Sequence, residues 1–96
     1  MDKITLEKLE KYFKITQEAL NKVKIKDFNL DNINSKKIAN EFLDMATRYF
    51  NDAKYFKEKG DIVTAFAALN YAHGWLDAGA KLGVFDVKDS KLFVLP

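Results

Sequence analysis

His73 and Asp77 are the two side chains in this 96-residue chain whose types and spacing come closest to chemistry. They lie four positions apart, which brings side chains into contact on one face of a helix. A carboxylate that orients an imidazole is found at catalytic and metal sites. The chain has one His and no Cys, however, and it contains no HExxH motif. We therefore predict a structural histidine bonded to Asp77 or to backbone, with a His73/Asp77 ligand site or enzyme as the alternative.

Three acidic residues, Asp52, Asp61 and Asp77, lie within or just after the aromatic-rich stretch from Tyr49 to Trp75. Paired carboxylates can perform acid–base catalysis when they converge. Asp61 is needed to cap a helix, Asp52 is expected to face solvent, and their separation along the chain indicates no convergence. The sequence therefore predicts no catalytic residue, no metal site and no cofactor.

Three lysines, Lys22, Lys24 and Lys26, alternate near the expected end of the first helix. Cations interact favourably with the dipole at a helix C-terminus, whereas phosphates prefer the N–H groups at an N-terminus. The net charge is only +2, and Arg48 is the single arginine in the chain. Both features argue against nucleic-acid binding. Weak RNA or anion binding through these lysines is kept as a second alternative.

Tyr71 and Trp75, together with Ala68 and Leu82, form an apolar strip beside the main apolar face of the expected third helix. A helix in a three-helix bundle needs only one broad apolar face, so this strip requires a cover. The candidates are the first helix, the apolar tail at residues 91–95, another protein or a second copy of the chain. Stacking of a flat ligand on the two rings is a further alternative.

Helices must position all of these residues. Apolar residues recur at helical spacing over residues 5–25, 35–59 and 61–82. Thr5 and Asn34 are expected to cap the first two helices. Between them, Phe28, Leu30 and Ile33 are expected to fold the connecting loop onto the bundle.

The pair Gly60-Asp61 predicts a tight reversal between the second and third helices. Gly60 can adopt the left-handed conformation that ends a helix, and Asp61 can cap the next one. So short a link predicts an αα-hairpin. Small residues at Ala65, Ala72 and Gly79 are expected to let large side chains of the second helix, such as Phe42 or Tyr49, pack closely.

The resulting prediction is a single all-α domain over residues 1–96. Its architecture is an antiparallel up-and-down three-helix bundle with an extended C-terminal tail at residues 84–96. No apolar stretch reaches the length of a membrane span, and the N-terminus has no signal-peptide pattern. These features predict a cytoplasmic protein that does not enter a membrane.

The segment from Tyr49 to Phe85 resembles an archaeal family of short proteins catalogued as domain of unknown function 357. The resemblance implies an up-and-down three-helix bundle and no established activity. The matching residues, which include the GD, YAxGWLDAG and LG pieces of the pattern, are Tyr49, Asp52, Ala53, Phe56, Gly60, Asp61, Ala65, Tyr71, Ala72, Gly74, Leu76, Asp77, Ala78, Gly79, Leu82 and Gly83.

Two further resemblances are looser and support a family assignment more weakly. The stretch GDIVTAFAALNYA is similar to the second helix of a tetratricopeptide repeat, but a repeat array has a period of about 34 residues and Lys26 stands one period before Gly60. The chain is also similar to HEPN-type helical ribonucleases, whose active site is an Arg followed a few residues later by a His. Ala53, Lys54 and Tyr55 occupy those places after Arg48.

These observations favour a small non-enzymatic helical module that binds a protein partner or a second copy of itself. The expected contact surface consists of Ala68, Tyr71, Trp75 and Leu82.

Overall fold

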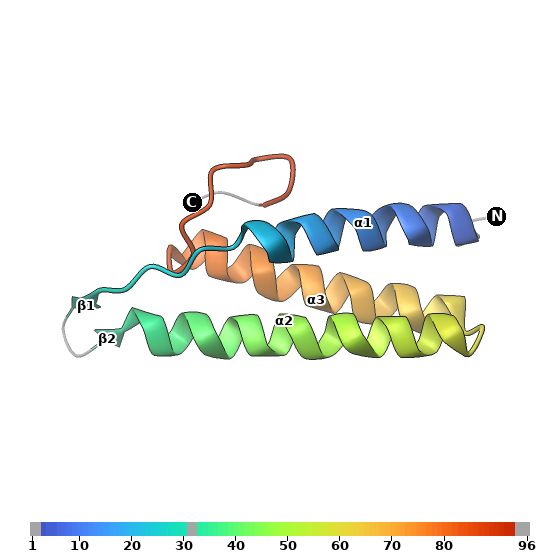
Figure 1. Ribbon diagram of the computed structural model, residues 1–96, viewed down its shortest axis with the longest axis horizontal. Coiled ribbons are helices and arrows are strands. Elements are labelled where there is room, and N and C mark those ends of the chain that lie inside the picture. Colours follow the sequence, from blue (N-terminus) through green and yellow to red (C-terminus); the bar gives the residue numbers. More distant parts are fainter. Residues whose placement is uncertain (1–2, 31–32, 94–96) are drawn as a thin grey trace.

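The protein is a bundle of three long helices, described by a computed structural model that covers residues 3–30 and 33–93. Helix α1 spans Leu6–Lys22, α2 spans Ser35–Glu58 and α3 spans Ile62–Leu82. Helix α2 runs antiparallel to α1 and α3, and α3 packs closely against both of the others (Figure 1). The all-α, up-and-down architecture predicted from the sequence is confirmed.

Each helix begins at a side-chain cap, as the sequence predicts. The backbone N–H of Lys8 donates to Thr5 Oγ1 (3.1 Å), and that of Lys37 donates to Asn34 Oδ1 (3.0 Å). At α3 the backbone N–H of Thr64 donates to Asp61 Oδ1 (3.1 Å). Each bond satisfies one of the N–H groups that a helix start leaves without an intrahelical partner.

The chain reverses at Gly60, whose φ of 80° lies in the left-handed region. The Asp61 N–H donates to the Phe56 carbonyl (2.9 Å) and the Gly60 N–H to the Lys57 carbonyl (3.0 Å). This is the pair of bonds of a Schellman motif, and Asp61 starts α3 directly afterwards. The predicted tight reversal and αα-hairpin are therefore confirmed.

The core is built largely from alanine, which accounts for eight of the sixteen buried apolar residues in the part of the chain that the structure describes. Small side chains let the α3 backbone approach both neighbours closely. One half of the core lies around Leu9, Phe50 and Leu69. The other half lies around Leu76 and includes Phe85, Leu92 and Phe93 from the segment that follows α3.

The first helix is shorter than predicted and ends at Lys22 rather than near residue 25. Residues 24–26 are extended and pair with residues 84–86 instead. The Lys26 N–H donates to the Val84 carbonyl (2.9 Å), and the Asp86 N–H donates to the Lys24 carbonyl (2.6 Å). A tertiary backbone pairing has therefore replaced the last helical turn.

A short antiparallel strand pair, β1 (Asn29–Leu30) and β2 (Ile33–Asn34), connects α1 to α2. Ser35 fixes its base, because its fully buried hydroxyl accepts from the Phe28 N–H (2.6 Å) and donates to the Lys26 carbonyl (2.9 Å). The Phe28 side chain is 41% exposed, so the prediction that it folds onto the bundle is wrong. The side chains of Leu30 and Ile33 lie outside the described parts.

The segment after α3 folds back along the C-terminal end of α1 (Figure 1). Val84, Phe85, Leu92 and Phe93 are buried, and a turn closes where the Phe93 N–H donates to the Asp89 carbonyl (3.0 Å). The tail is thus ordered through Phe93 but only partly extended. Within residues 3–30 and 33–93, no helix has the length and apolar character needed to cross a membrane.

Candidate functional site

His73 lies on α3 at its seam with α1, where it contacts a polar residue on each side. The Thr16 hydroxyl of α1 lies 3.4 Å from His73 Nδ1, and Asp77 Oδ1 lies 3.6 Å from Nε2. The His73 and Asp77 side chains are 24% and 28% exposed, whereas Thr16 is 1% exposed. The predicted contact with Asp77 is present, and the partner Thr16 was not predicted.

A pocket of about 250 Å³ opens beside His73. It is lined by Tyr12, Ile15, Thr16, Leu69, Asn70, His73, Gly74 and Asp77. A hydroxyl, an imidazole and a carboxylate in a row resemble the components of a nucleophilic triad. The hydroxyl is buried, however, and both contacts are longer than ordinary hydrogen bonds. This geometry supports the interpretation of His73 as a residue that joins α1 to α3.

The acidic residues of the sequence do not converge on this pocket. Across the ranges that the structure describes, no three His, Cys, Asp or Glu side chains are grouped so that they could hold a metal ion. Asp52 is exposed on α2, as predicted. Asp61 caps α3, and hydrogen bonds from the Thr64 side chain and backbone hold the pKa of its carboxyl below the usual value.

The predicted lysine cluster at the end of α1 is only partly engaged: the ammonium group of Lys22 has an ionic partner, whereas the side chains of Lys24 and Lys26 are exposed. Lys22 Nζ forms an ion pair with Asp89 Oδ2 (3.1 Å), and this bond, together with one from the Lys91 N–H, lowers the pKa of Asp89. The backbone of Lys24 and Lys26 pairs with the segment after α3. Two carboxylates, Asp86 and Asp89, line the same groove as three lysines, Lys22, Lys24 and Lys88. The local arrangement is therefore mixed in charge.

The predicted interaction surface is partly present. Tyr71 and Leu82 are 63% and 58% exposed, so both side chains lie open to solvent. Trp75 is half-buried and packs edge-on against Phe42 of α2, with ring centroids 5.1 Å apart. Ala68 is only 8% exposed and lies in the core, so its assignment to the surface is wrong.

Tyr71 does not project freely but is held against α2. Its ring stacks on the ring of Tyr49 with centroids 5.3 Å apart and an angle of 22° between planes. A shallow groove of about 520 Å³ lies beside the stacked pair and contains no charged residue. It is lined by Tyr49, Asn70, Tyr71, Gly74, Trp75 and Ala78.

This groove belongs to a longer apolar face that α3 turns to solvent. All of its members are exposed: Val63, Ala67, Tyr71, Gly74, Ala78 and Leu82. Their spacing of three or four residues places them on one side of the helix. The face runs from the first to the last turn of α3, with Lys81 at its edge. Sequence reasoning found Tyr71 and Leu82 but did not assign the small residues between them, Gly74 and Ala78, to this face.

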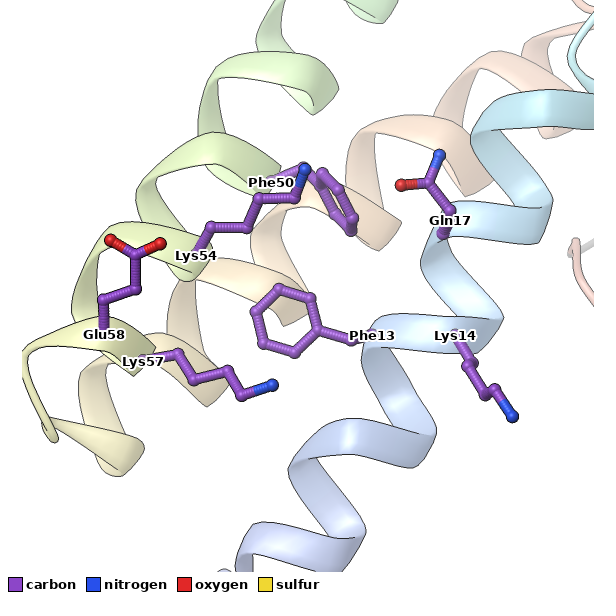
Figure 2. A pocket seen from close by; sticks show the side chains of 7 residues that line it. All are labelled: Phe13, Lys14, Gln17, Phe50, Lys54, Lys57 and Glu58. Atoms are coloured by element: carbon purple, nitrogen blue, oxygen red, sulfur yellow. The ribbon is translucent and has the colours of Figure 1, made fainter.

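A further groove, between α1 and α2, was not predicted. It has a volume of about 470 Å³ and is shown in Figure 2. Its lining consists of Phe13, Lys14 and Gln17 from α1 and Phe50, Lys54, Lys57 and Glu58 from α2. The signal was present in the sequence, because Phe50, Lys54 and Lys57 follow helical spacing and must share one face.

The family model described as "Protein of unknown function (DUF357)" matches residues 11–85. The chain belongs to this family. No curated protein and no solved structure gave a significant match.

The DUF357 match includes most of α1, all of α2 and α3, and the segment up to Phe85. The groove beside Tyr71, the groove between α1 and α2 and the His73 pocket therefore lie within the family domain, while Leu92 and Phe93 lie beyond it. The family description assigns no activity, so a function for this DUF357 chain must be argued from its surfaces.

Proposed function

We propose that this protein is a non-enzymatic interaction module that pairs with a second copy of itself through the exposed face of α3. The observation that carries the proposal is the placement of Tyr71. This aromatic ring is 63% exposed, is fixed against Tyr49, and stands next to a hollow at Gly74 and Ala78.

The α3 face is complementary to itself. In a two-fold dimer, the same patch of each subunit meets its counterpart. If two α3 helices cross antiparallel with Gly74 at the centre, a residue on one side of Gly74 meets the residue equally far on the other side. Tyr71 of one copy then lies over the Gly74–Ala78 hollow of the other, and Ala67 lies near Lys81. The Tyr71 ring of each copy thus fits into the hollow of the other, so the same contact forms twice in the dimer.

The charge distribution supports a second copy rather than a charged partner. No Asp, Glu, Lys or Arg occurs between Ile62 and Leu76. Two identical faces therefore meet without like-charge repulsion over most of their length. Exposed apolar faces of this kind are typical of association sites.

The contact is expected to be weak. Stable interfaces use about 20–30 residues on each side. The α3 face offers six residues, to which Tyr49 and Trp75 add partial contributions. We therefore expect association in the micromolar to millimolar range, so the protein will populate monomer and dimer according to concentration.

Sedimentation equilibrium between about 10 µM and 1 mM tests this proposal. The wild type is expected to rise from the mass of one chain towards that of two. Tyr71→Glu and Ala78→Glu place a charge in the contact and are expected to remain monomeric. Tyr55→Glu is the matched control, because Tyr55 is 55% exposed and lies on α2 away from this face, so it should associate like the wild type.

A wild type that stays monomeric throughout this range would refute self-association. Equal association of Tyr71→Glu and the wild type would show that a dimer uses another surface. Circular dichroism of each variant confirms that the helices are intact, so that loss of association is not mistaken for loss of fold.

A further inference from the structure

The side of the bundle between α1 and α2 is the least closed. Helix α3 packs closely against both neighbours, whereas α1 and α2 have hardly any close backbone approach to each other. The groove of about 470 Å³ lies on this side (Figure 2). This groove lies on different helix faces from the exposed α3 face around Tyr71 and from the His73 pocket, and it is part of neither.

The floor of this groove is aromatic and fixed. Phe13 of α1 and Phe50 of α2 meet across it, with ring centroids 5.6 Å apart and an angle of 68° between planes. Phe50 is 4% exposed, and both rings belong to the core formed around Leu9 and Ala53. The floor therefore needs no rearrangement to receive an apolar group.

Lysines surround this floor. Lys54 Nζ lies 4.9 Å from the centre of the Phe50 ring, and Lys57 Nζ lies 5.2 Å from the centre of the Phe13 ring. Figure 2 shows both ammonium groups reaching towards the rings. Lys14 lies at the rim on the α1 side, and in Figure 2 its ammonium group points away from the rings.

The positive charge is only partly neutralised. Lys57 pairs with Glu10 at 3.7 Å, and in Figure 2 the carboxylate of Glu58 points away from the rings. Lys54 makes no ion pair with any residue that the structure describes; its ammonium group is held over an aromatic face instead. Of the two ammonium groups near the rings, that of Lys57 has a carboxylate partner and that of Lys54 has none among the described residues, so the excess positive charge next to the apolar floor comes from Lys54.

The dimensions of the groove favour a small molecule over a protein. On α2 it extends from Phe50 to Glu58, which is about 12 Å of helix. Its seven lining residues are far fewer than the 20–30 that a protein interface uses on each side. Its volume falls in the range of small-molecule pockets, about 300–1,000 Å³.

We infer that this groove binds a small amphiphilic anion, with its apolar body on Phe13 and Phe50 and its carboxylate between Lys54 and Lys57. An anion there would exchange a weak cation–π contact of each lysine for a charge-assisted hydrogen bond, which is the stronger interaction. Gln17 lies at the α1 wall, where its amide N–H donates to Asn21 Oδ1 (3.1 Å).

Titration of the labelled protein followed by two-dimensional ¹H–¹⁵N NMR tests the inference. The probes are 2-naphthoate for an aromatic body and decanoate for an aliphatic one. Saturable shifts are expected at Phe13, Phe50, Lys54 and Lys57, with a Kd of about 1 mM for a ligand of this size. The probe with the lower Kd identifies which kind of apolar body the floor prefers.

Two controls separate this site from general attraction to a basic protein. Lys54→Gln/Lys57→Gln is expected to weaken binding at least tenfold. Lys36→Gln/Lys37→Gln removes the same charge from exposed positions at the other end of α2 and should leave the Kd unchanged. 2-Naphthylmethylamine has the same rings with the opposite charge and should bind at least tenfold more weakly than 2-naphthoate.

Three results would overturn the inference: no saturable shifts with either anion up to about 10 mM, equal binding of the amine, or an unchanged Kd in Lys54→Gln/Lys57→Gln. Tyr71→Glu is expected to bind 2-naphthoate like the wild type, so failure of the dimer proposal and failure of this one are distinguishable. These variants alter exposed or half-exposed side chains, and their NMR spectra report directly on whether the fold is retained.

Discussion

Two glycines in α3, Gly74 and Gly79, should respond in opposite ways to the same substitution. A Cβ at Gly74 would meet no other atom within 4 Å, and the position is exposed. A Cβ at Gly79 would overlap the ring of Phe85, with three ring carbons closer than 3.0 Å. Phe85 has little freedom to move, because it is 2% exposed and its backbone pairs with Ile25.

The expected changes in the free energy of unfolding follow from comparing the two variants. Replacing Gly by Ala in a helix stabilises the protein by about 1 kcal/mol, and this gain is common to both. Overpacking of a filled core costs about 1–3 kcal/mol, and contact with three ring atoms favours the upper value. Gly74→Ala should therefore be about 1 kcal/mol more stable than the wild type, and Gly79→Ala about 2 kcal/mol less stable.

Thermal unfolding at about 5 µM measures the difference. At about 4–8 °C per kcal/mol for a domain of this size, Tm should rise by roughly 4–8 °C in Gly74→Ala and fall by roughly 8–16 °C in Gly79→Ala. Adding Phe85→Leu should recover part of the loss in Gly79→Ala, because it removes ring atoms from the overlap. Equal Tm values for the two alanine variants would refute the packing of Phe85 on Gly79.

The remaining predictions concern single polar groups. Ser35→Ala should lower the free energy of unfolding in urea by about 1–3 kcal/mol, since it leaves the Phe28 N–H without its bond, whereas Ser90→Ala at an exposed site should change little. The pKa of Asp61 is lower in the folded chain than in the unfolded one, so its stabilising effect is present above about pH 4 and is lost as the pH falls through the folded value. Asp61→Asn should therefore flatten the acid part of a plot of unfolding free energy against pH. An unchanged plot would contradict this. His73→Ala should cost about 1 kcal/mol through its contact with Thr16 and leave self-association unchanged; loss of association without loss of stability would instead point to a binding role.

The helices were predictable because their signals are local. Thr5, Asn34 and Asp61 cap helices as expected, and the Gly60 turn has the expected left-handed backbone. Each of these assignments depends on residues a few positions apart, where backbone geometry allows few solutions. The exposed apolar face of α3 was predictable only in part. Helical spacing shows which residues share a face, but it does not show which face remains uncovered.

The errors arose where distant segments meet. Gly79 was expected to receive a large side chain of α2, but Phe85 fills the space instead, because the chain turns back at Gly83, whose φ is 87°. That return also pairs residues 84–86 with residues 24–26 and so ends α1 early.

The same return separates the tail from the aromatic surface. Leu92 and Phe93 are buried with Ala19 and Val23 of the α1 end, where Lys22 binds Asp89. The apolar character of the tail, which suggested a cover for Tyr71, is therefore already used as far as Phe93; residues 94 and 95 lie outside the described part. An apolar sequence shows only that a segment needs burial. The surface against which it packs depends on the turns that precede the segment in the chain. Tyr71 remains 63% exposed although the tail up to Phe93 is packed elsewhere, and for this reason we look to a second copy of the chain for its cover.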